Sequence, residues 1–286
     1  MIINTLQIKT EQLATGTFKT GSGSEIILIV GSCRSVPYLQ YLSDWNEQNN
    51  DRFTIHFIDP FSWNWNMKEE RVDYHAELIK QETNENLLSV LKSTSIFIHE
   101  YYNNAGMFNI IHKSDFDKKS GRYPMIKTIY NYGLRPKIDI CIPNFNDIFI
   151  LTNDIVSMDI NIRKMAIQDY NVIGKLSTQT IREIDFVREK NIARFVNICS
   201  KTDFPEMADI FMARYKTIRF FWTSNHIAKT FSQTIFWLMN DKFLKLNTLD
   251  YVISENDLYA NNYTKLNEYD TYYNWNEPIE PLKNIL

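Results

Sequence analysis

The sequence predicts an α/β fold, in which helices flank a central, mostly parallel sheet and a helical insertion follows. Three short apolar runs, at 25–30, 53–58 and 95–99, have the length and composition of buried strands. The intervening segments 37–45 and 74–91 are expected to be helices, because a proline opens the first and the second has helical spacing. Strands that alternate with helices are typical of a parallel sheet covered by helices.

The rest of the chain adds a longer helical part. Residues 1–24 carry turn-forming glycines and are expected to form only a lead-in to the sheet. The aromatic and acidic tail at 251–286 is expected to wrap the surface. The other expected elements, in chain order, are a strand at 137–142, mainly helical structure at 153–200, a helix at 205–215, a strand at 218–222 and an amphipathic helix from about 226 to 244.

We expect residues 1–286 to form a single domain. Within it, residues 25–150 form the core half of the sheet, and residues 151–250 form a mainly helical part that returns to the sheet. A chain of 286 residues is long enough to bury a substantial core. Homo-oligomerisation, or fusion to a further domain, stays open.

Composition narrows the class of protein. The formal net charge of −3 at pH 7 gives no sign of a nucleic-acid-binding protein. No apolar run approaches the roughly 18 residues that a membrane span needs, and the first residues lack the pattern of a signal peptide. The three cysteines are widely spaced and form no CxxC pair, which predicts reduced thiols, a cytoplasmic location and no metal site.

The five residues Gly31, Ser32, Cys33, Arg34 and Ser35 lie between the first apolar run and the first expected helix. A helix N-terminus favours a thiolate over a thiol, and it can also hold a phosphate or an oxyanion. The scarce glycine predicts a tight turn at this point. The alternative is that the cysteine is a small apolar residue that fills the turn, because cysteine is often buried.

Two histidines lie where a catalytic base is expected. His99 ends the third apolar run, and the carboxyl ends of parallel strands form one edge, so His99 and Cys33 are expected to share it. His226 follows the expected strand at 218–222, at a helix start, where a lowered pKa suits a neutral base. The alternatives are a strand-capping role for His99 and a surface position for His226. His56, inside an apolar run, is expected to be structural.

Further residues are candidates for substrate binding. A loop is expected directly after His99, at the edge where ligands bind in α/β sheets. Trp63 and Trp65 form a pair that suits stacking on a sugar or base, although such pairs also serve packing. Arg34 suits a phosphate or carboxylate. The substrate-binding candidates are Glu100, Tyr101, Asn103, Asn104 and Trp63.

Three segments together resemble the WcbI-type polysaccharide-biosynthesis acetyltransferases. The run Gly-Ser-Cys-Arg at 31–34 is similar to that family's Gly-Asn-Cys-Gln. The segment 211–222, followed by Thr-Ser-Asn-His at 223–226, resembles an aromatic strand that leads into a His-Pro-Thr helix start, with Ile227 in place of the proline. The run Tyr-Gly-Leu-Arg-Pro at 132–136 resembles the family's middle segment. The Gly-Ser-Cys form is also similar to the GSCFA group, which is related to the Ser-Gly-Asn-His hydrolases.

This resemblance implies layers like those of the Ser-Gly-Asn-His hydrolases or the Rossmann fold. It also implies a coenzyme A-dependent acetyltransferase that modifies a sugar or nucleotide-sugar in glycan biosynthesis. Cys33 would pair with His99 or His226, and transfer directly or through an acetylated cysteine stays open. The alternatives are an esterase or deacetylase like the Ser-Gly-Asn-His hydrolases, and a non-enzymatic glycan-binding module. The coenzyme A contacts assigned are Gly31, Ser32, Arg34, Ser35 and Asn225.

Overall fold

The computed structural model describes residues 11–14, 17–59, 85–101, 133–143, 150–223 and 226–247. The chain divides into two compact units, and the expectation of a single domain stays a prediction. The first unit consists of Met1–Asn144, Lys201–Phe204 and Ile235–Glu255, and the second of Phe145–Ser200, Pro205–Thr234 and Asn256–Leu286.

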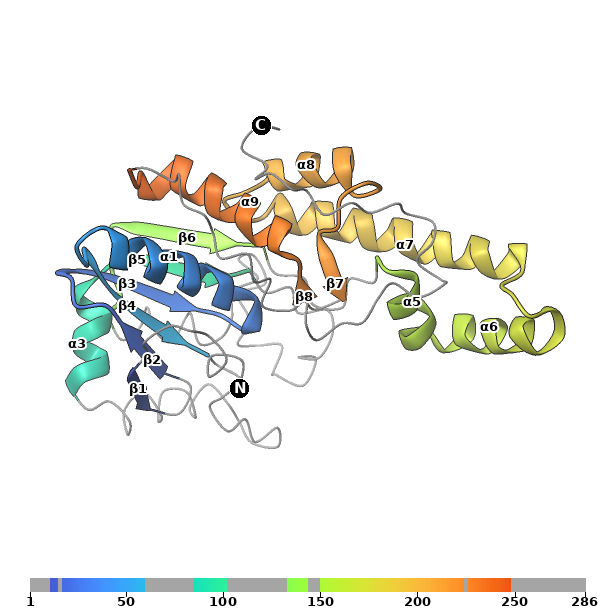
Figure 1. Cartoon of the computed structure of the whole chain (residues 1–286), viewed down its shortest axis with the longest axis horizontal. Helices are drawn as coiled ribbons and strands as arrows, with labels where there is room; N and C mark the ends of the chain where they lie inside the picture. Colours follow the sequence, from blue (N-terminus) through green and yellow to red (C-terminus); the bar gives the residue numbers. More distant parts are fainter. Residues whose placement is uncertain are drawn as a thin grey trace. The chain divides into compact units, whose positions relative to one another are not determined.

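A six-stranded sheet forms the centre of the first unit (Figure 1). Its strands are β1 (Glu11–Ala14), β2 (Thr17–Thr20), β3 (Glu25–Val30), β4 (Phe53–Ile58), β5 (Thr94–Glu100) and β6 (Ile138–Ile142). They lie in the order β1-β2-β4-β3-β5-β6. The strands β4, β3, β5 and β6 are parallel, whereas β2 and β1 join the edge as an antiparallel pair. The predicted α/β class with a mostly parallel sheet is therefore confirmed.

The antiparallel pair at the edge corrects one expectation. Residues 11–14 and 17–20 form strands, so it was wrong to expect only a lead-in there. Strand β2 pairs with β4 over its whole length, and Phe18 packs on Phe57 with ring centroids 6.5 Å apart. Two four-residue strands with few apolar residues are too short for their alternation to stand out in the sequence.

Helix α1 (Val36–Gln48) follows β3 and covers one face of the sheet, called here the α1 face (Figure 1). The Oγ1 of Thr20 lies 3.3 Å from the Oγ of Ser43 in α1, which identifies that face. Ile55 of β4 is the register partner of Thr20, and Ile27 of β3 is the register partner of Ile55. Register partners place their side chains on the same face of a sheet, so Ile55 and Ile27 also point to the α1 face. Alternate residues of each strand therefore line the α1 face and the opposite face, and both sets are buried in the core.

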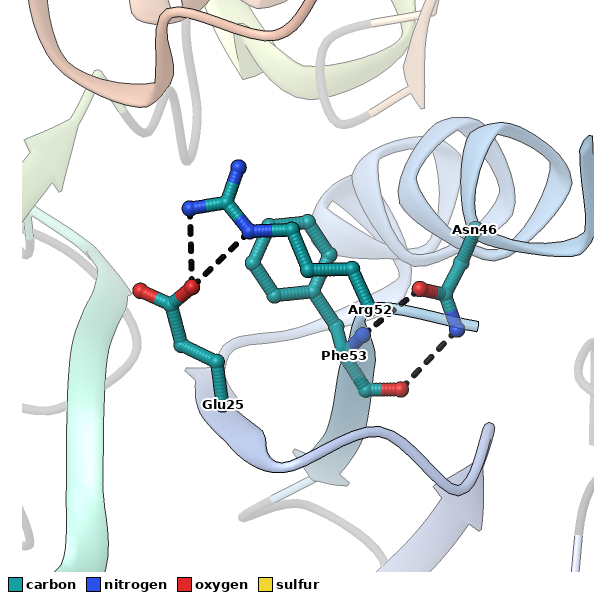
Figure 2. Close-up of polar contacts among 4 residues, drawn as sticks. All are labelled: Glu25, Asn46, Arg52 and Phe53. Carbon is teal, nitrogen blue, oxygen red and sulfur yellow. Dashed lines mark hydrogen bonds and ion pairs between the residues drawn. The ribbon is translucent and has the colours of Figure 1, made fainter. Parts of the chain in front are cut away.

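The last turn of α1 is fixed to the start of β4, at the amino end of the parallel strands. Figure 2 shows the buried Asn46 side chain, which donates to the Phe53 carbonyl (2.9 Å) and accepts from the Phe53 N–H (2.7 Å). In the same view, Arg52 forms an ion pair with Glu25 of β3 at 2.8 Å. One amide side chain thus binds both backbone groups of Phe53, whose carbonyl also accepts from the Gly23 N–H at 3.2 Å.

The remaining elements are mainly helical, as expected for 153–200 and 205–215. No helix in the described ranges combines the length and the apolar character that crossing a bilayer requires. Asp159 and Ser177 cap the amino ends of two of the helices with their side-chain oxygens. These elements are α3 (Glu85–Ser93), α5 (Thr152–Met158), α6 (Ile160–Ile173), α7 (Thr178–Cys199), α8 (Glu206–Arg214), β7 (Phe221–Thr223), β8 (His226–Ile227) and α9 (Lys229–Met239), which continues as a π-helical turn over Asn240–Leu244.

Candidate functional site

The candidate site begins where β3 ends, at the carboxyl edge of the parallel strands. The N–H of Gly31 donates to the Ile58 carbonyl at 3.1 Å, which extends the pairing with β4 by one residue. A Cβ on Gly31 would lie 2.1 Å from the Oγ of Ser35 and 2.8 Å from a carboxylate oxygen of Glu100. Glycine is required here by close approach, which confirms the tight turn that the sequence predicts.

A buried carboxylate holds the turn that follows. Residues Cys33–Ser35 form one 3₁₀ turn that leads directly into α1. The Ser32 N–H and hydroxyl donate to Glu100 Oε1 at 2.8 and 2.9 Å, and the Ser35 hydroxyl donates to the same oxygen at 2.6 Å. Glu100, the last residue of β5, is 0% exposed. The turn is therefore bound to the neighbouring strand through one side chain.

Cys33 is the residue of this turn that reaches solvent. It is half-buried, whereas Gly31, Ser32, Arg34 and Ser35 are all buried. Burial raises the pKa of the Cys33 thiol, and the charges of Glu100 and Asp59 raise it further, against the lowering effects of Arg34 and of a hydrogen bond with Ser32. The structure therefore favours a neutral thiol, and the thiolate expected from the helix N-terminus is not supported.

The backbone of the turn is largely engaged with itself. Besides the Ser32 N–H, the Ser35 N–H donates to the Ser32 carbonyl at 2.9 Å, and the Arg34 N–H points to the Ser32 hydroxyl at 3.4 Å. The Arg34 Nε donates to the same hydroxyl at 3.1 Å. The serines and Gly31 therefore have structural partners, and their contact with coenzyme A stays a prediction. The turn therefore presents the neutral thiol of Cys33 next to the buried guanidinium of Arg34.

His99 lies at the same edge of the sheet but points the other way. As neighbours in β5, His99 and Glu100 project to opposite faces, and Glu100 is on the α1 face with the turn. The His99 ring is 0% exposed and lies beside Cys141, its register partner in β6. Its Nε2 is 3.2 Å from the Oδ1 of Asp139. Strand β3, which leads to Cys33, and strand β5, which contains His99, are neighbours, as expected. The pairing of Cys33 with His99 as thiol and base stays a prediction.

The environment of His99 favours the charged imidazolium. Burial by itself lowers the pKa of His99. The sulfur of Cys141 and the carboxylate of Asp139 outweigh that effect and raise the pKa to about 9. A group that is protonated at neutral pH is an acid or a structural cation and not a ready base.

The other predicted residues divide between described and undescribed parts of the chain. His226 is half-buried and lies in the short strand β8, opposite Thr223, and not at the start of the helix as expected. Tyr101 is buried, and its N–H donates to the Ile142 carbonyl at 2.7 Å.

Burial, followed by the charge of Lys19, lowers the pKa of His56 to about 4, which fits the structural role expected for it. Three positions named as substrate contacts, Trp63, Asn103 and Asn104, and one named as a coenzyme A contact, Asn225, fall outside the described residues.

Sequence reasoning missed two acidic residues that shape this edge. Glu100 was expected to contact substrate, yet its carboxylate faces Ser32 and Ser35 inside the protein. Asp139 was not singled out, although a carboxylate inside the apolar run at 138–142 was a visible signal. Within the described ranges, no group of three or more His, Cys, Asp or Glu side chains is arranged to hold a metal ion.

Comparison with known proteins adds a distant likeness. No family model matches the chain, and no curated protein matches it either. Among solved structures it is similar to WcbI, described as a polysaccharide biosynthesis enzyme in its native form without a disulfide bond between coenzyme A and a cysteine. The identity is 12% over 82% of this chain and 73% of that chain, with a TM-score of 0.44. A likeness of this size carries no argument about activity.

Proposed function

We propose that this protein is a coenzyme A-dependent acyltransferase, and that the acyl group passes to a sugar or nucleotide-sugar at the turn around Cys33. The observation that carries the proposal is the way the turn presents Cys33. A partly exposed thiol stands at the carboxyl edge of a parallel sheet, in a turn whose other residues are buried. Ligands of open α/β sheets bind at this edge. The sequence resemblance of residues 31–34 to WcbI-type acetyltransferases supports the same reaction class.

The residues of the turn fit an acyl thioester. The fit rests on a compact thiol for contact with a thioester and on the buried cation of Arg34, four residues after the end of β3. Acetyl-CoA would supply the acetyl group in activated form. Arg34 would stabilise negative charge that develops on the acyl oxygen, as cations do in acyl-transfer sites. The neutral state of Cys33 favours direct transfer to the acceptor over attack by a thiolate.

The base that accepts the proton of the acceptor hydroxyl or amine is proposed to be a histidine, His99 or His226. The raised pKa of His99 counts against it as a base at neutral pH. Replacing each by glutamine separates them, because loss of the base flattens the acidic limb of the pH profile of kcat, whereas loss of a structural cation lowers stability.

The first experiment is binding of coenzyme A and acetyl-CoA, followed by thermal unfolding. At a ligand concentration of about 100 times Kd, binding adds about 2.7 kcal/mol, which raises the Tm of a chain of this size by about 5 °C. A Tm that stays unchanged at millimolar coenzyme A would overturn the proposal. Arg34→Gln is expected to weaken the shift, and Arg194→Gln, in helix α7 of the second unit, serves as the charge-matched control.

The second experiment measures the reaction itself. Release of free coenzyme A from acetyl-CoA is followed with a panel of sugars and nucleotide-sugars, for the wild type and for Cys33→Ala. A drop in kcat of tenfold or more, about 1.4 kcal/mol, is expected for Cys33→Ala, and Cys199→Ala is the control because that buried cysteine lies in α7. Full activity of Cys33→Ala contradicts the role given to the turn. Hydrolysis of acetylated sugars without coenzyme A would point instead to an esterase.

A further inference from the structure

Glu100 is a buried carboxylate that the acyl-transfer proposal does not use. It is 0% exposed, and its Oε1 accepts from the Ser32 N–H at 2.8 Å, from the Ser32 hydroxyl at 2.9 Å and from the Ser35 hydroxyl at 2.6 Å. Its second oxygen lies 3.1 Å from the Ser32 hydroxyl. A buried charge is tolerated only where hydrogen bonds or opposite charges compensate it, and these donors supply that compensation.

In the described part of the chain, the carboxylate is buried against protein groups. Gly31 lies directly against it, since a Cβ there would come within 2.8 Å of the Oε1. Among the described residues, the groups around it include the two serine hydroxyls of the turn and Tyr38 of α1, whose pKa is raised by burial and then by the charges of Tyr41 and Glu100. A carboxylate in this position acts on the turn and not on a ligand.

Three charged side chains from separate parts of the chain act on the Cys33 thiol. Glu100 ends β5, Asp59 follows β4, and Arg34 is the next residue in the turn. All three interact electrostatically with the thiol, the carboxylates in one direction and the guanidinium in the other. Of the two carboxylates, Glu100 is the one that also binds the residues on both sides of Cys33.

We propose that Glu100 is a positioning residue that governs the reactivity of Cys33. Its buried carboxylate fixes the turn that presents the sulfur at the sheet edge, and it places a negative charge beside that sulfur. The turn therefore holds the cysteine as a neutral thiol that contacts a bound group without attacking it. This role concerns only the reactivity of the Cys33 thiol, and it does not depend on the acyl transfer proposed above.

The test is alkylation of Cys33 by iodoacetamide between pH 6 and pH 10, with the modified peptide quantified by mass spectrometry in the full chain. The thiolate sulfur forms a bond to carbon and iodide leaves, so the rate follows the thiolate fraction. Glu100→Gln keeps the size of the side chain and an acceptor oxygen but removes the charge. We expect its rate at pH 8 to rise about threefold, because the gain in thiolate is partly offset by lower nucleophilicity. Its pH profile is expected to move to lower pH.

Two further variants separate positioning from general destabilisation. Glu100→Asp restores the charge and is expected to return the profile toward that of the wild type. Asn46→Ala removes a buried polar side chain at the other end of α1, so it lowers stability without touching the charges around Cys33. An equal rise in rate for Asn46→Ala, or an unchanged profile for Glu100→Gln, would overturn the proposal.

The charge arrangement gives a second test if the Glu100 variants fail to fold. Arg34→Gln removes the charge that opposes Glu100 and Asp59 at the sulfur. Alkylation of Cys33 is then expected to slow about threefold at pH 8, opposite to the effect of removing a carboxylate. A rate that rises or stays unchanged in Arg34→Gln shows that the charges around the turn do not govern the thiol.

Discussion

His99 and Glu100 are consecutive residues of one strand, and each is fully buried beside a different cysteine. Glu100 points to the α1 face, where serine hydroxyls and a backbone N–H bind its carboxylate beneath Cys33. His99 points to the opposite face, beside Asp139 and Cys141. The carboxylate of Glu100 thus acts on the partly exposed thiol of Cys33, whereas the imidazolium of His99 lies beside the buried thiol of Cys141.

The difference shows how one strand end serves two purposes. On the opposite face, the charges of His99 and Asp139 compensate each other within the sheet, and the thiol beside them is buried. On the α1 face, the charge of Glu100 is used to bind a turn, and the turn leaves the Cys33 thiol partly exposed. We therefore interpret the His99 group as part of the framework and the Cys33 turn as the functional part.

The largest expected effect comes from filling the space beneath the Cys33 turn. In Gly31→Ala, the new methyl group would lie 2.1 Å from the Ser35 Oγ and 2.6 Å from the Ser35 Cβ, so the turn must move off Glu100. We expect a loss of about 3 kcal/mol or more in the free energy of unfolding, measured by urea denaturation. Gly174→Ala is the control, because that glycine has φ +69° but open space around it, and about 1 kcal/mol is expected there. Equal losses in the two variants would show that the close packing beneath the turn is unimportant.

The second prediction concerns pH and tests the opposite face. The pKa of His99 is raised from 6.5 to about 9 in the folded protein. The folded state therefore binds the proton more tightly, so the stabilisation is complete below pH 6.5 and is lost as the pH rises through about 9. The loss amounts to at most about 3.5 kcal/mol, since one pKa unit corresponds to about 1.4 kcal/mol.

Urea denaturation at intervals from pH 6 to pH 10 measures this loss. His99→Gln cannot take up the proton, so its free energy of unfolding is expected to vary less with pH over the same range. If the free energy of unfolding has the same slope against pH in His99→Gln and in the wild type, the pH dependence comes from other groups. His99 is then not a buried imidazolium that stabilises the fold.

The sequence allowed most of the parallel sheet to be predicted, because the runs at 25–30, 53–58, 95–99 and 137–142 are apolar and bounded by turns. Such strands are buried on both faces and carry a strong signal. The pair β1 and β2 was missed because it lies at the edge and is short. Pairing with β4 stabilises it, and long-range pairing of this kind leaves little trace in local sequence.

The site was predicted in part. The scarce Gly31 and the position of Cys33 after a strand pointed to the turn correctly. The direction of His99 was not predicted, because the side to which a strand residue points depends on a register that the sequence does not specify at strand ends. The burial of Glu100 was missed because a glutamate that follows a strand is usually exposed. Its donors, Ser32 and Ser35, lie more than 60 residues earlier in the chain.

The smallest expected effect compares the two cysteines directly. Cys33→Ser is expected to change the free energy of unfolding by less than about 0.5 kcal/mol, because the side chain is half-buried and the bonds that fix the turn to Glu100 come from Ser32 and Ser35. Cys141→Ser places a hydroxyl in a buried site, where β6 is held by Asp203 through a 2.6 Å bond to the Cys141 N–H, and we expect a loss of about 1 kcal/mol.

Cys141→Ser also reports on His99. The Cys141 sulfur is one cause of the raised pKa of His99, so its removal is expected to move the pH-dependent loss of stability to lower pH. Cys33→Ser leaves that midpoint unchanged, because Cys33 belongs to the turn on the α1 face. Urea denaturation of both variants across the pH range measures the two midpoints. A shift in Cys33→Ser, or none in Cys141→Ser, would mean that the two faces of the strand end are not electrostatically separate.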